Sequence, residues 1–210
     1  MSVKLVGYTV PNIEGQESLK DMVVYCARVS NPENQMNKET ADKLFEYLKD
    51  NKHWSPFEMV HVVMEIETTR DIARQILRHR SFSFQEFSQR YAKVDGKPVY
   101  REARMQDTKN RQNSTECLDP QKMAFWQQHQ IRVWEQAQNA YEWAIQNGIA
   151  KEQARAVLPE GITPSRMYMG GTLRSWIHYI ELRSGNGTQK EHRDIAIQCG
   201  EVIKELLNDH

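Results

Sequence analysis

The most regular pattern in the chain is an alternation of apolar and polar residues over 59–68, where every second residue from Val60 to Ile66 is apolar. Period-two alternation with β-branched residues is typical of a strand that is buried on one face. Residues 3–10 form a shorter apolar stretch that ends before Pro11, a residue tolerated at sheet edges. The pattern therefore predicts one well-buried strand and one edge strand.

Elsewhere, apolar residues recur three or four positions apart, which is the spacing of a helix with one buried face. This spacing predicts helices over 17–29, 37–49, 71–79, 122–146, 151–158, 165–182 and 188–207. Thr69 is placed to cap the third of these helices, and Gly170 and Gly171 interrupt the sixth. Residues 93–121 are polar, so we expect a long surface excursion or lid there. Because no repeat or boundary is found, residues 1–210 are interpreted as a single α-rich α/β domain.

The composition is that of a globular protein, with 39% hydrophobic and 27% charged residues. Basic and acidic residues number 28 each, so the chain as a whole has no polyanion-binding signature. No apolar run approaches the ~18 residues of a membrane span, and the N-terminal residues lack the apolar core of a signal peptide. Three widely spaced cysteines without a CxxC pair indicate a reducing compartment. We therefore expect a cytoplasmic protein that binds neither membrane nor nucleic acid.

Common cofactor motifs are missing from the sequence. It contains neither GxxxxGK(S/T) nor GxGxxG, the two usual phosphate-binding loops, and it contains no HExxH. His53 and His61 lie eight residues apart around the start of a predicted strand, which is poor spacing for metal ligands. We therefore predict no metal site.

A basic and aromatic segment over 78–91 carries the densest candidate chemistry. It opens with Arg78-His79-Arg80 and continues with serines, phenylalanines and Glu86. Cations are tolerated at the end of a helix, so the basic triplet alone also fits a solvated helix terminus. Guanidinium groups with hydroxyls suit a phosphate, whereas aromatic rings beside a carboxylate suit a base or a flavin. Further arginines stand in apolar helical contexts, at positions 155, 166, 174 and 183. These residues predict a phosphorylated, nucleotide-like ligand without assigning a reaction.

The triplet Arg78-His79-Arg80, followed after seven residues by Ser88, resembles the RHR-x7-S signature of the flavin-dependent thymidylate synthases. The similarity extends over roughly residues 20–205 in the order of the family. It includes the stretches His53-Trp54-Ser55-Pro56-Phe57-Glu58, Ala154-Arg155 to Leu158-Pro159, Arg174-Ser175 and Leu182-Arg183. Gln85, Thr172 and His178 stand where relatives can have asparagine, and Gly170-Gly171 is unusual in the helix predicted over 165–182.

This resemblance implies an enzyme that converts dUMP to dTMP. The family takes its one-carbon unit from methylenetetrahydrofolate and its reducing power from NADPH through FAD. The resemblance also implies an α+β fold, with a helix-rich domain around a mainly antiparallel twisted sheet. Members are homotetramers whose active sites are shared between chains, which would explain why arginines far apart in the sequence converge.

The resemblance also assigns roles to individual residues. Positions that match dUMP contacts are Gln75, Arg78, Glu86, Phe87, Ser88, Gln89, Arg90, Arg155 and Arg183. Positions that match FAD contacts are Ser55, Arg78, His79, Arg80, Glu86, Thr172, Arg174 and His178. Arg183 falls at the position associated with ionisation of the uracil N3, so we expect it to be the catalytic residue. Ser88 has no convincing neighbouring base, so we expect its hydroxyl to be a ligand of the nucleotide and not a nucleophile.

Two other classes of function fit parts of the same pattern. The alternation of arginine and phenylalanine over 78–91 would suit a nucleotide-binding or single-stranded nucleic-acid-binding protein without catalysis, although the zero net charge argues against it. A purely structural oligomerisation domain could use the tryptophans at 126, 134, 143 and 176 as interface anchors. Purified protein should be yellow if it binds FAD, and colourless in either alternative.

Overall fold

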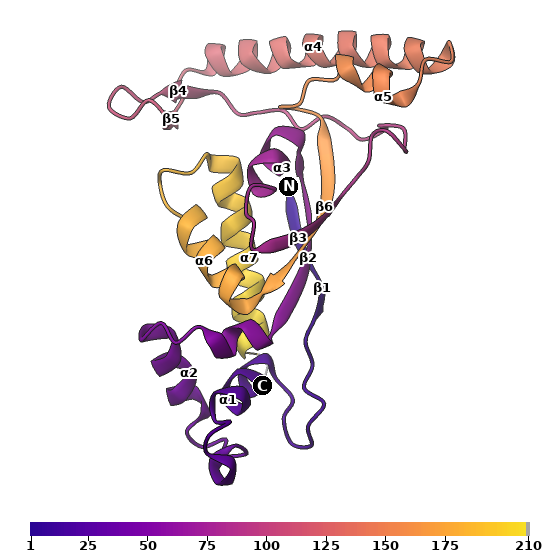
Figure 1. Ribbon diagram of the computed structural model, residues 1–210. Coiled ribbons are helices and arrows are strands. Elements are labelled where there is room, and N and C mark those ends of the chain that lie inside the picture. The colour runs from indigo at the N-terminus through magenta and orange to yellow at the C-terminus, as the bar shows by residue number, and fades with distance from the viewer. Residues whose placement is uncertain (209–210) are drawn as a thin grey trace.

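The computed structural model describes residues 1–208 (Figure 1). Its strands are β1 (Ser2–Tyr8), β2 (His61–Thr69), β3 (Phe82–Glu86), β4 (Arg104–Gln106), β5 (Ser114–Glu116) and β6 (Pro164–Thr172). Its α-helices are α1 (Leu19–Ala27), α2 (Ala41–Asp50), α3 (Arg70–Ile76), α4 (Pro120–Gln146), α5 (Lys151–Ala154), α6 (Leu173–Arg183) and α7 (Lys190–Asn208). Three short 3-10 helices complete the list: η1 (Pro32–Asn34), η2 (Ser55–Met59) and η3 (Arg155–Val157).

The main sheet has the strand order β1-β2-β6-β3, and each neighbouring pair is antiparallel. A second sheet is the small hairpin of β4 and β5. The predicted helix-rich α+β architecture with an antiparallel sheet is therefore confirmed. The two strands expected from the hydrophobic pattern are β1, which lies at an edge, and β2, which lies inside the sheet.

One face of this sheet forms the base of the core. Val62, Met64 and Ile66 of β2 are fully buried, as are Met167 and Met169 of the neighbouring β6. These side chains pack with residues of α3, α6 and α7, which Figure 1 shows on a single side of the sheet. Because side chains alternate between the two faces of a strand, the sheet has one face that is covered by helices. Helices α3, α6 and α7 over this face also carry polar residues of the site described below.

The predicted helix over 165–182 is wrong in its first half. Residues 164–172 form strand β6, and only the following residues are helical. Burial alternates along β6, since Met167 and Met169 are buried while Tyr168 is 38% exposed, which is the period of a strand and not of a helix. Thr172 caps the helix that follows, because its hydroxyl accepts a hydrogen bond from the Ser175 backbone N–H at 3.2 Å.

The glycines that were expected to interrupt a helix have a different role. Gly171 pairs with Phe82 of β3, and a Cβ at Gly171 would lie 2.4 Å from the Phe82 ring. Gly170 faces His61 on the neighbouring β2, where a Cβ would lie 3.1 Å from the imidazole. Because neither glycine has a side chain, the Phe82 ring can lie against Gly171 and the His61 ring against Gly170. This close approach of two rings to β6 explains both glycines.

The basic and aromatic segment of the sequence begins in a turn and continues into edge strand β3. Helix α3 ends at Ile76, earlier than the predicted end at residue 79, so Arg78, His79 and Arg80 lie on the turn that follows. Thr69 stands at the capping position of α3, but its hydroxyl hydrogen-bonds to the Asp71 carboxylate at 2.5 Å and not to the helix backbone. The motif is therefore presented on a turn and a sheet edge.

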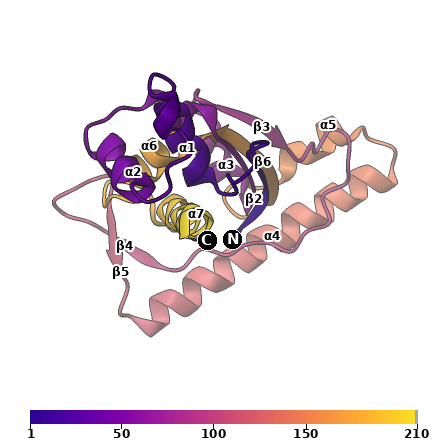
Figure 2. The same cartoon turned by 90° about the horizontal axis from the view of Figure 1, so that it is seen from below.

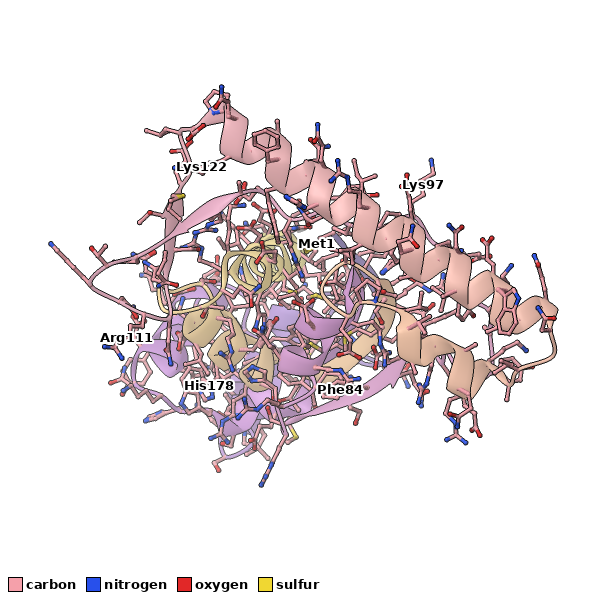
Figure 3. All side chains as sticks on the ribbon, turned by 90° about the horizontal axis from the view of Figure 1, so that it is seen from above. Met1, Phe84, Lys97, Arg111, Lys122 and His178 are labelled. Carbon is pink, nitrogen blue, oxygen red and sulfur yellow. The ribbon has the colours of Figure 1, made fainter. Side chains whose placement is uncertain are left out.

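Helix α4 and the preceding excursion cross one end of the molecule (Figure 1) and extend past the body of the fold (Figure 2). Within the polar excursion, Arg101 is anchored inwards, since its guanidinium donates to the Asp71 carboxylate at 2.8 and 3.0 Å. Side chains project from much of α4, as Figure 3 shows with Lys122 near its beginning. Among the tryptophans considered as interface anchors, Trp134 and Trp176 are buried, whereas Trp126 and Trp143 are 44% and 61% exposed.

Candidate active site

Arg183, the last residue of α6, lies beside His79 on the turn after α3. Its Nε–H donates a hydrogen bond to His79 Nε2 at 2.9 Å. The predicted catalytic arginine and a predicted flavin contact, 104 positions apart in the chain, are thus brought into direct contact. Within residues 1–208, the terminal nitrogens of Arg183 have no recorded hydrogen-bond partner, so the planar end of the guanidinium is available to a ligand.

His79 is held in its neutral form. Burial lowers its pKa, and the positive charge of Arg183 lowers it further. A neutral imidazole has one acceptor nitrogen, and the contact with Arg183 makes that acceptor Nε2. The His79 ring also meets the edge of the Tyr179 ring, with centroids 4.9 Å apart. Arg183 is therefore oriented by a ring that is itself fixed by an aromatic neighbour.

Gln75 joins the same cluster from the C-terminal half of α3. Its amide oxygen lies 3.3 Å from His192 Nδ1, and its amide nitrogen donates to Gln189 Oε1 at 2.8 Å. His192 in turn contacts the Tyr179 hydroxyl through Nε2 at 3.1 Å. We call these six residues the Arg183 cluster: Gln75, His79, Tyr179, Arg183, Gln189 and His192.

A second group of predicted residues lines a cavity of about 300 Å³ on the other side of α3. The Arg155 pocket, as we call it, contains two predicted dUMP contacts, Gln89 and Arg155, together with Arg70 and Arg74 of α3. Gln89 is 5% exposed, and its amide nitrogen has no partner among the described residues. Arg70 and Arg74 are paired with Glu86 and Glu160, whereas the Arg155 side chain has no recorded partner within residues 1–208. The Arg155 guanidinium and the Gln89 amide are thus the donors that fit an oxygen-rich ligand such as a nucleotide phosphate.

Glu86 is tied to the protein on this side of α3. It accepts hydrogen bonds from Arg70 at 2.6 Å and from the Ser165 hydroxyl at 2.7 Å. Arg90 lies 3.5 Å from the carboxylate of Glu152, which also lines the Arg155 pocket. The Phe87 side chain lines a separate cavity of about 520 Å³, together with Val94 and others. Glu86 and Arg90 thus border the pocket, while Phe87 packs away from it.

A third group assembles where η2 meets α6, and we call it the Arg174 group. Arg174 hydrogen-bonds to Glu58 of η2, and the ring of His178 stands edge-on to Trp54 with centroids 4.6 Å apart. The first residue of η2 is Ser55, and Thr172 caps α6. Figure 3 shows His178 on the side of the body away from α4. Four predicted flavin contacts (Ser55, Thr172, Arg174 and His178) therefore come from η2, the end of β6 and α6.

Three of the predicted residues are exposed on connecting segments. Arg78, Arg80 and Ser88 are exposed, and within residues 1–208 none of these side chains has a recorded hydrogen bond or ion pair. Exposed unpaired arginines with a neighbouring hydroxyl have their full hydrogen-bonding capacity free for a ligand. In a single chain the predicted residues consequently form three groups: the Arg183 cluster, the Arg155 pocket and the Arg174 group. Arg78 and Arg80 lie between α3 and β3, and Ser88 follows β3.

Sequence reasoning missed several residues of these groups. Tyr179, Gln189 and His192 belong to no recognised motif, and Arg70 lies outside the RHR segment. Arg70 and Arg74 are four residues apart on α3, so their shared face was a detectable signal. Tyr179 and His192 meet only because α6 and α7 pack side by side, so their partnership left no spacing signal in the sequence.

A change in pH should reveal the buried His192. Burial, followed by the charges of Arg183 and His79, lowers the pKa of His192 from 6.5 to about 3. The unfolded chain therefore binds a proton that the folded chain rejects, so the free energy of unfolding falls as pH falls below 6.5. We expect His192→Asn to reduce this slope by up to about 1.4 kcal/mol per pH unit, measured by urea unfolding between pH 7.5 and 5.

At a fixed protein concentration, the slopes of the unfolding free energy with pH should differ most between the variant and the unaltered chain at the acidic end of this range. Equal slopes for the two proteins would contradict a neutral buried His192.

Comparison with known proteins identifies the family. The model of the family described as Thy1, thymidylate synthase complementing protein, matches residues 10–207. The "Flavin-dependent thymidylate synthase" of Synechocystis sp. is 48% identical over 97% of this chain and 94% of its own length. The chain belongs to the flavin-dependent thymidylate synthase family. The expectation drawn from the RHR motif is therefore confirmed.

Other relatives agree with this family assignment. A protein of Paramecium bursaria Chlorella virus 1, named "Probable flavin-dependent thymidylate synthase", is 50% identical over 98% of this chain and 95% of its own length. Among solved structures, the UMP/dUMP methylase PolB of Streptomyces cacaoi with bound 5-Br dUMP has a TM-score of 0.82 and 28% identity. That match covers 98% of this chain and 90% of PolB. The resemblance thus extends over nearly the whole fold.

Two further structural findings concern other kinds of site. Among the helices of residues 1–208, none combines the length and the apolar character that a bilayer span requires. No group of three or more histidine, cysteine, aspartate or glutamate side chains in the same residues is arranged to hold a metal ion. The three cysteines are free, and burial raises the pKa of the Cys199 thiol far above its usual value.

Proposed function

We propose that this member of the flavin-dependent thymidylate synthase family methylates dUMP to dTMP, with methylenetetrahydrofolate as carbon donor and NADPH as reductant through FAD. The observation that carries the proposal is the convergence of Gln75, His79 and Arg183, three positions that the family motif links to dUMP, FAD and catalysis. The Arg155 pocket supports it with the Arg155 guanidinium and the unpartnered amide of Gln89, two donors for an anionic substrate. The PolB structure, solved with a halogenated dUMP, has the same fold.

Arg183 would activate the uracil ring by electrostatics. A guanidinium cannot accept a proton near neutral pH, but it stabilises negative charge that develops on the ring when N3 is ionised. Its Nε–H is donated to His79, so the pair of terminal nitrogens, which has no recorded partner within residues 1–208, would be left as a planar donor fork for the ligand. The chain would thus lower the barrier by positioning charge, without a cysteine nucleophile.

The donor set of the chain also fits FAD. Arg78, Arg80 and Arg174 offer guanidinium groups that suit a diphosphate, and Ser55, Thr172 and His178 add neutral polar groups. His79 and Glu86 complete the residues that would hold the cofactor. When bound, FAD supplies the redox chemistry of the reaction. The protein contributes its placement beside the Arg183 cluster, because α6 carries both Arg174 and Arg183.

We also propose that the active protein is a cytoplasmic homotetramer in which different chains complete each site. The three groups of site residues do not close over one cavity within residues 1–208. Large apolar side chains are exposed along α4, namely Met123, Phe125, Trp126, Val133 and Trp143, and such a surface is typical of an interface. Light scattering in solution tests the tetramer by measuring the mass of the particle directly. The three free cysteines support a cytoplasmic location, because free thiols are typical of a reducing compartment.

The function is tested by an assay of dUMP-dependent NADPH oxidation with added FAD. NADPH oxidation and dTMP formation should both require dUMP, and dTMP should form only when methylenetetrahydrofolate is present. A colourless protein that refuses added FAD and forms no dTMP would refute the proposal.

Ser88→Ala should lower the activity but leave measurable turnover. The exposed Ser88 hydroxyl has no recorded contact with a basic side chain among the described residues, so it would bind the nucleotide without attacking it. Loss of one hydrogen bond corresponds to roughly a threefold to tenfold rise in the KM for dUMP. Steady-state kinetics measures this effect, and a covalent Ser88–nucleotide adduct detected by mass spectrometry would show that Ser88 is a nucleophile.

A further inference from the structure

A chain of hydrogen bonds runs from the core to the surface through the Arg183 cluster. The Tyr179 hydroxyl lies 3.1 Å from His192 Nε2, and His192 Nδ1 lies 3.3 Å from Gln75 Oε1. Gln75 Nε2 then donates to Gln189 Oε1 at 2.8 Å, and Gln189 Nε2 donates to Glu191 Oε2 at 2.9 Å. This series of hydrogen bonds thus ends on the carboxylate of Glu191.

The carboxylate sets the direction of every bond in this chain. An ionised Glu191 only accepts, so Gln189 presents its amide nitrogen to Glu191 and its oxygen to Gln75. Gln75 must then donate to Gln189 and turn its own oxygen toward His192. The hydrogen of neutral His192 is therefore on Nδ1, and the Tyr179 hydroxyl donates to the remaining lone pair on Nε2.

The buried end of the chain sets the same direction. Tyr179 is 2% exposed and His192 is fully buried. Burial keeps the imidazole neutral, with its pKa lowered to about 3, and it raises the pKa of the Tyr179 hydroxyl so that the hydroxyl stays protonated and able to donate. Two polar groups inside an apolar core are costly unless their hydrogen bonds are made. An apolar pair would fill this space without that requirement, so packing alone does not account for them.

We propose that His192, held by Tyr179, is a positioning residue that orients the Gln75 amide toward the nucleotide. Gln75 is half-buried; its oxygen is occupied by His192 and one amide hydrogen by Gln189. The second amide hydrogen is left as the group that Gln75 can offer to a ligand beside Arg183. A uracil ring has carbonyl oxygens that accept such a bond, and an ionised N3 accepts it more strongly.

This inference rests on the proposed function, because it takes the ligand of Gln75 to be dUMP. Without the Nδ1–H of His192, only the contact with the exposed Gln189 side chain still holds the Gln75 amide. An exposed hydrogen bond is weakened by competing water, so the amide would rotate by half a turn more often and present its oxygen to the uracil carbonyls. Two acceptors then face each other, so affinity for dUMP falls although Gln75 and Arg183 are both still present. The effect should appear in binding of dUMP more than in turnover at saturating dUMP.

The experiment compares His192→Leu with His192→Asn in the FAD-loaded protein, by calorimetric titration with dUMP. Leucine removes the donor to Gln75, so the dissociation constant should rise roughly threefold to tenfold. Asparagine can place an amide N–H near the position of Nδ1–H and should recover at least half of that loss on a logarithmic scale. If affinities instead follow the melting temperatures of the variants, or if His192→Leu binds as the unaltered protein does, the positioning role is refuted.

Tyr179→Phe gives a second test that keeps the ring and removes only the hydroxyl. We expect a roughly twofold to threefold loss of dUMP affinity with unchanged FAD content and absorbance. Tyr141→Phe is the matched control, because Tyr141 is equally buried and its hydroxyl accepts one hydrogen bond from the Val94 backbone, away from the Arg183 cluster. Equal dUMP affinities for the two variants would refute the role of Tyr179. An unaltered protein that does not bind dUMP would refute the proposed function itself and this inference with it.

Discussion

Arg183→Ala is expected to remain yellow and to lose most dTMP formation, with a fall in kcat of roughly 100- to 1000-fold at saturating dUMP. The guanidinium would stabilise charge that appears on the uracil ring during the reaction, so its loss affects the rate more than binding. The flavin should be retained because Arg183 is not among the predicted FAD contacts and its removal leaves the Arg174 group in place. The measurement is dTMP production by the FAD-loaded variant.

Arg183→Lys separates charge from shape. Lysine keeps the positive charge but lacks the planar fork, so it should recover only part of the lost rate. Arg193→Ala is a suitable control, since within residues 1–208 the one recorded side-chain hydrogen bond of this arginine is to Asn186, at 3.2 Å, and Arg193 lies outside the three site groups. Near-normal turnover by Arg183→Ala would reduce Arg183 to a cation at the end of α6, a position that the helix dipole favours in any case.

The convergence at Arg183 was predictable because a long motif carried it. The RHR segment and the Leu182-Arg183 pair match family positions to which the resemblance assigns a role. The structure places Arg183 Nε 2.9 Å from Nε2 of His79. The bond between His79 and Arg183 was not predictable, since both residues were expected to contact ligands. Only the three-dimensional packing shows that a predicted flavin contact, His79, also orients the predicted catalytic residue, Arg183.

The fold was predictable where a single period dominated a segment. Strand β2 and helices α2, α4 and α7 have strong alternation or helical spacing, and all four are confirmed within a few residues. Strand β3 was missed because its alternation of aromatic and polar residues extends over only five residues, too short a run to indicate a strand by itself. Strand β6 was assigned to a helix because methionine is a good helix former, and here the tertiary context overrode that local preference.

The hydrogen bond between Tyr179 and His192 could not be predicted from the sequence, for a different reason. Tyr179 and His192 lie on separate helices, and each alone is compatible with ordinary packing in an apolar core. Their hydrogen bond exists only because α6 and α7 are neighbours, which no local spacing reveals. A site built from contacts between elements thus needs the structure, whereas a site built on a motif does not.

Arg78→Ala is expected to abolish activity and to weaken binding of FAD or dUMP roughly tenfold to a hundredfold. Arg78 follows α3 on the turn that leads from Gln75 to β3, and its exposed side chain has no recorded partner within residues 1–208. A guanidinium at this place could reach both ligands, and loss of a charge-assisted hydrogen bond costs about 1.5–3 kcal/mol. Fluorescence titration with FAD and calorimetric titration with dUMP measure the two affinities separately.

The same exposure makes this prediction easy to interpret. Removing an exposed, unpaired side chain should change the free energy of unfolding by less than about 0.5 kcal/mol, so lost activity cannot be ascribed to unfolding. Arg111→Ala is the matched control, because Arg111 is an equally exposed arginine in the loop between β4 and β5, where Figure 3 shows it at the margin of the molecule. If Arg78→Ala, like this control, kept both affinities within twofold, Arg78 would be removed from the site. The guanidinium groups without a recorded partner within residues 1–208 that remain for a phosphate would then be those of Arg80 and Arg155.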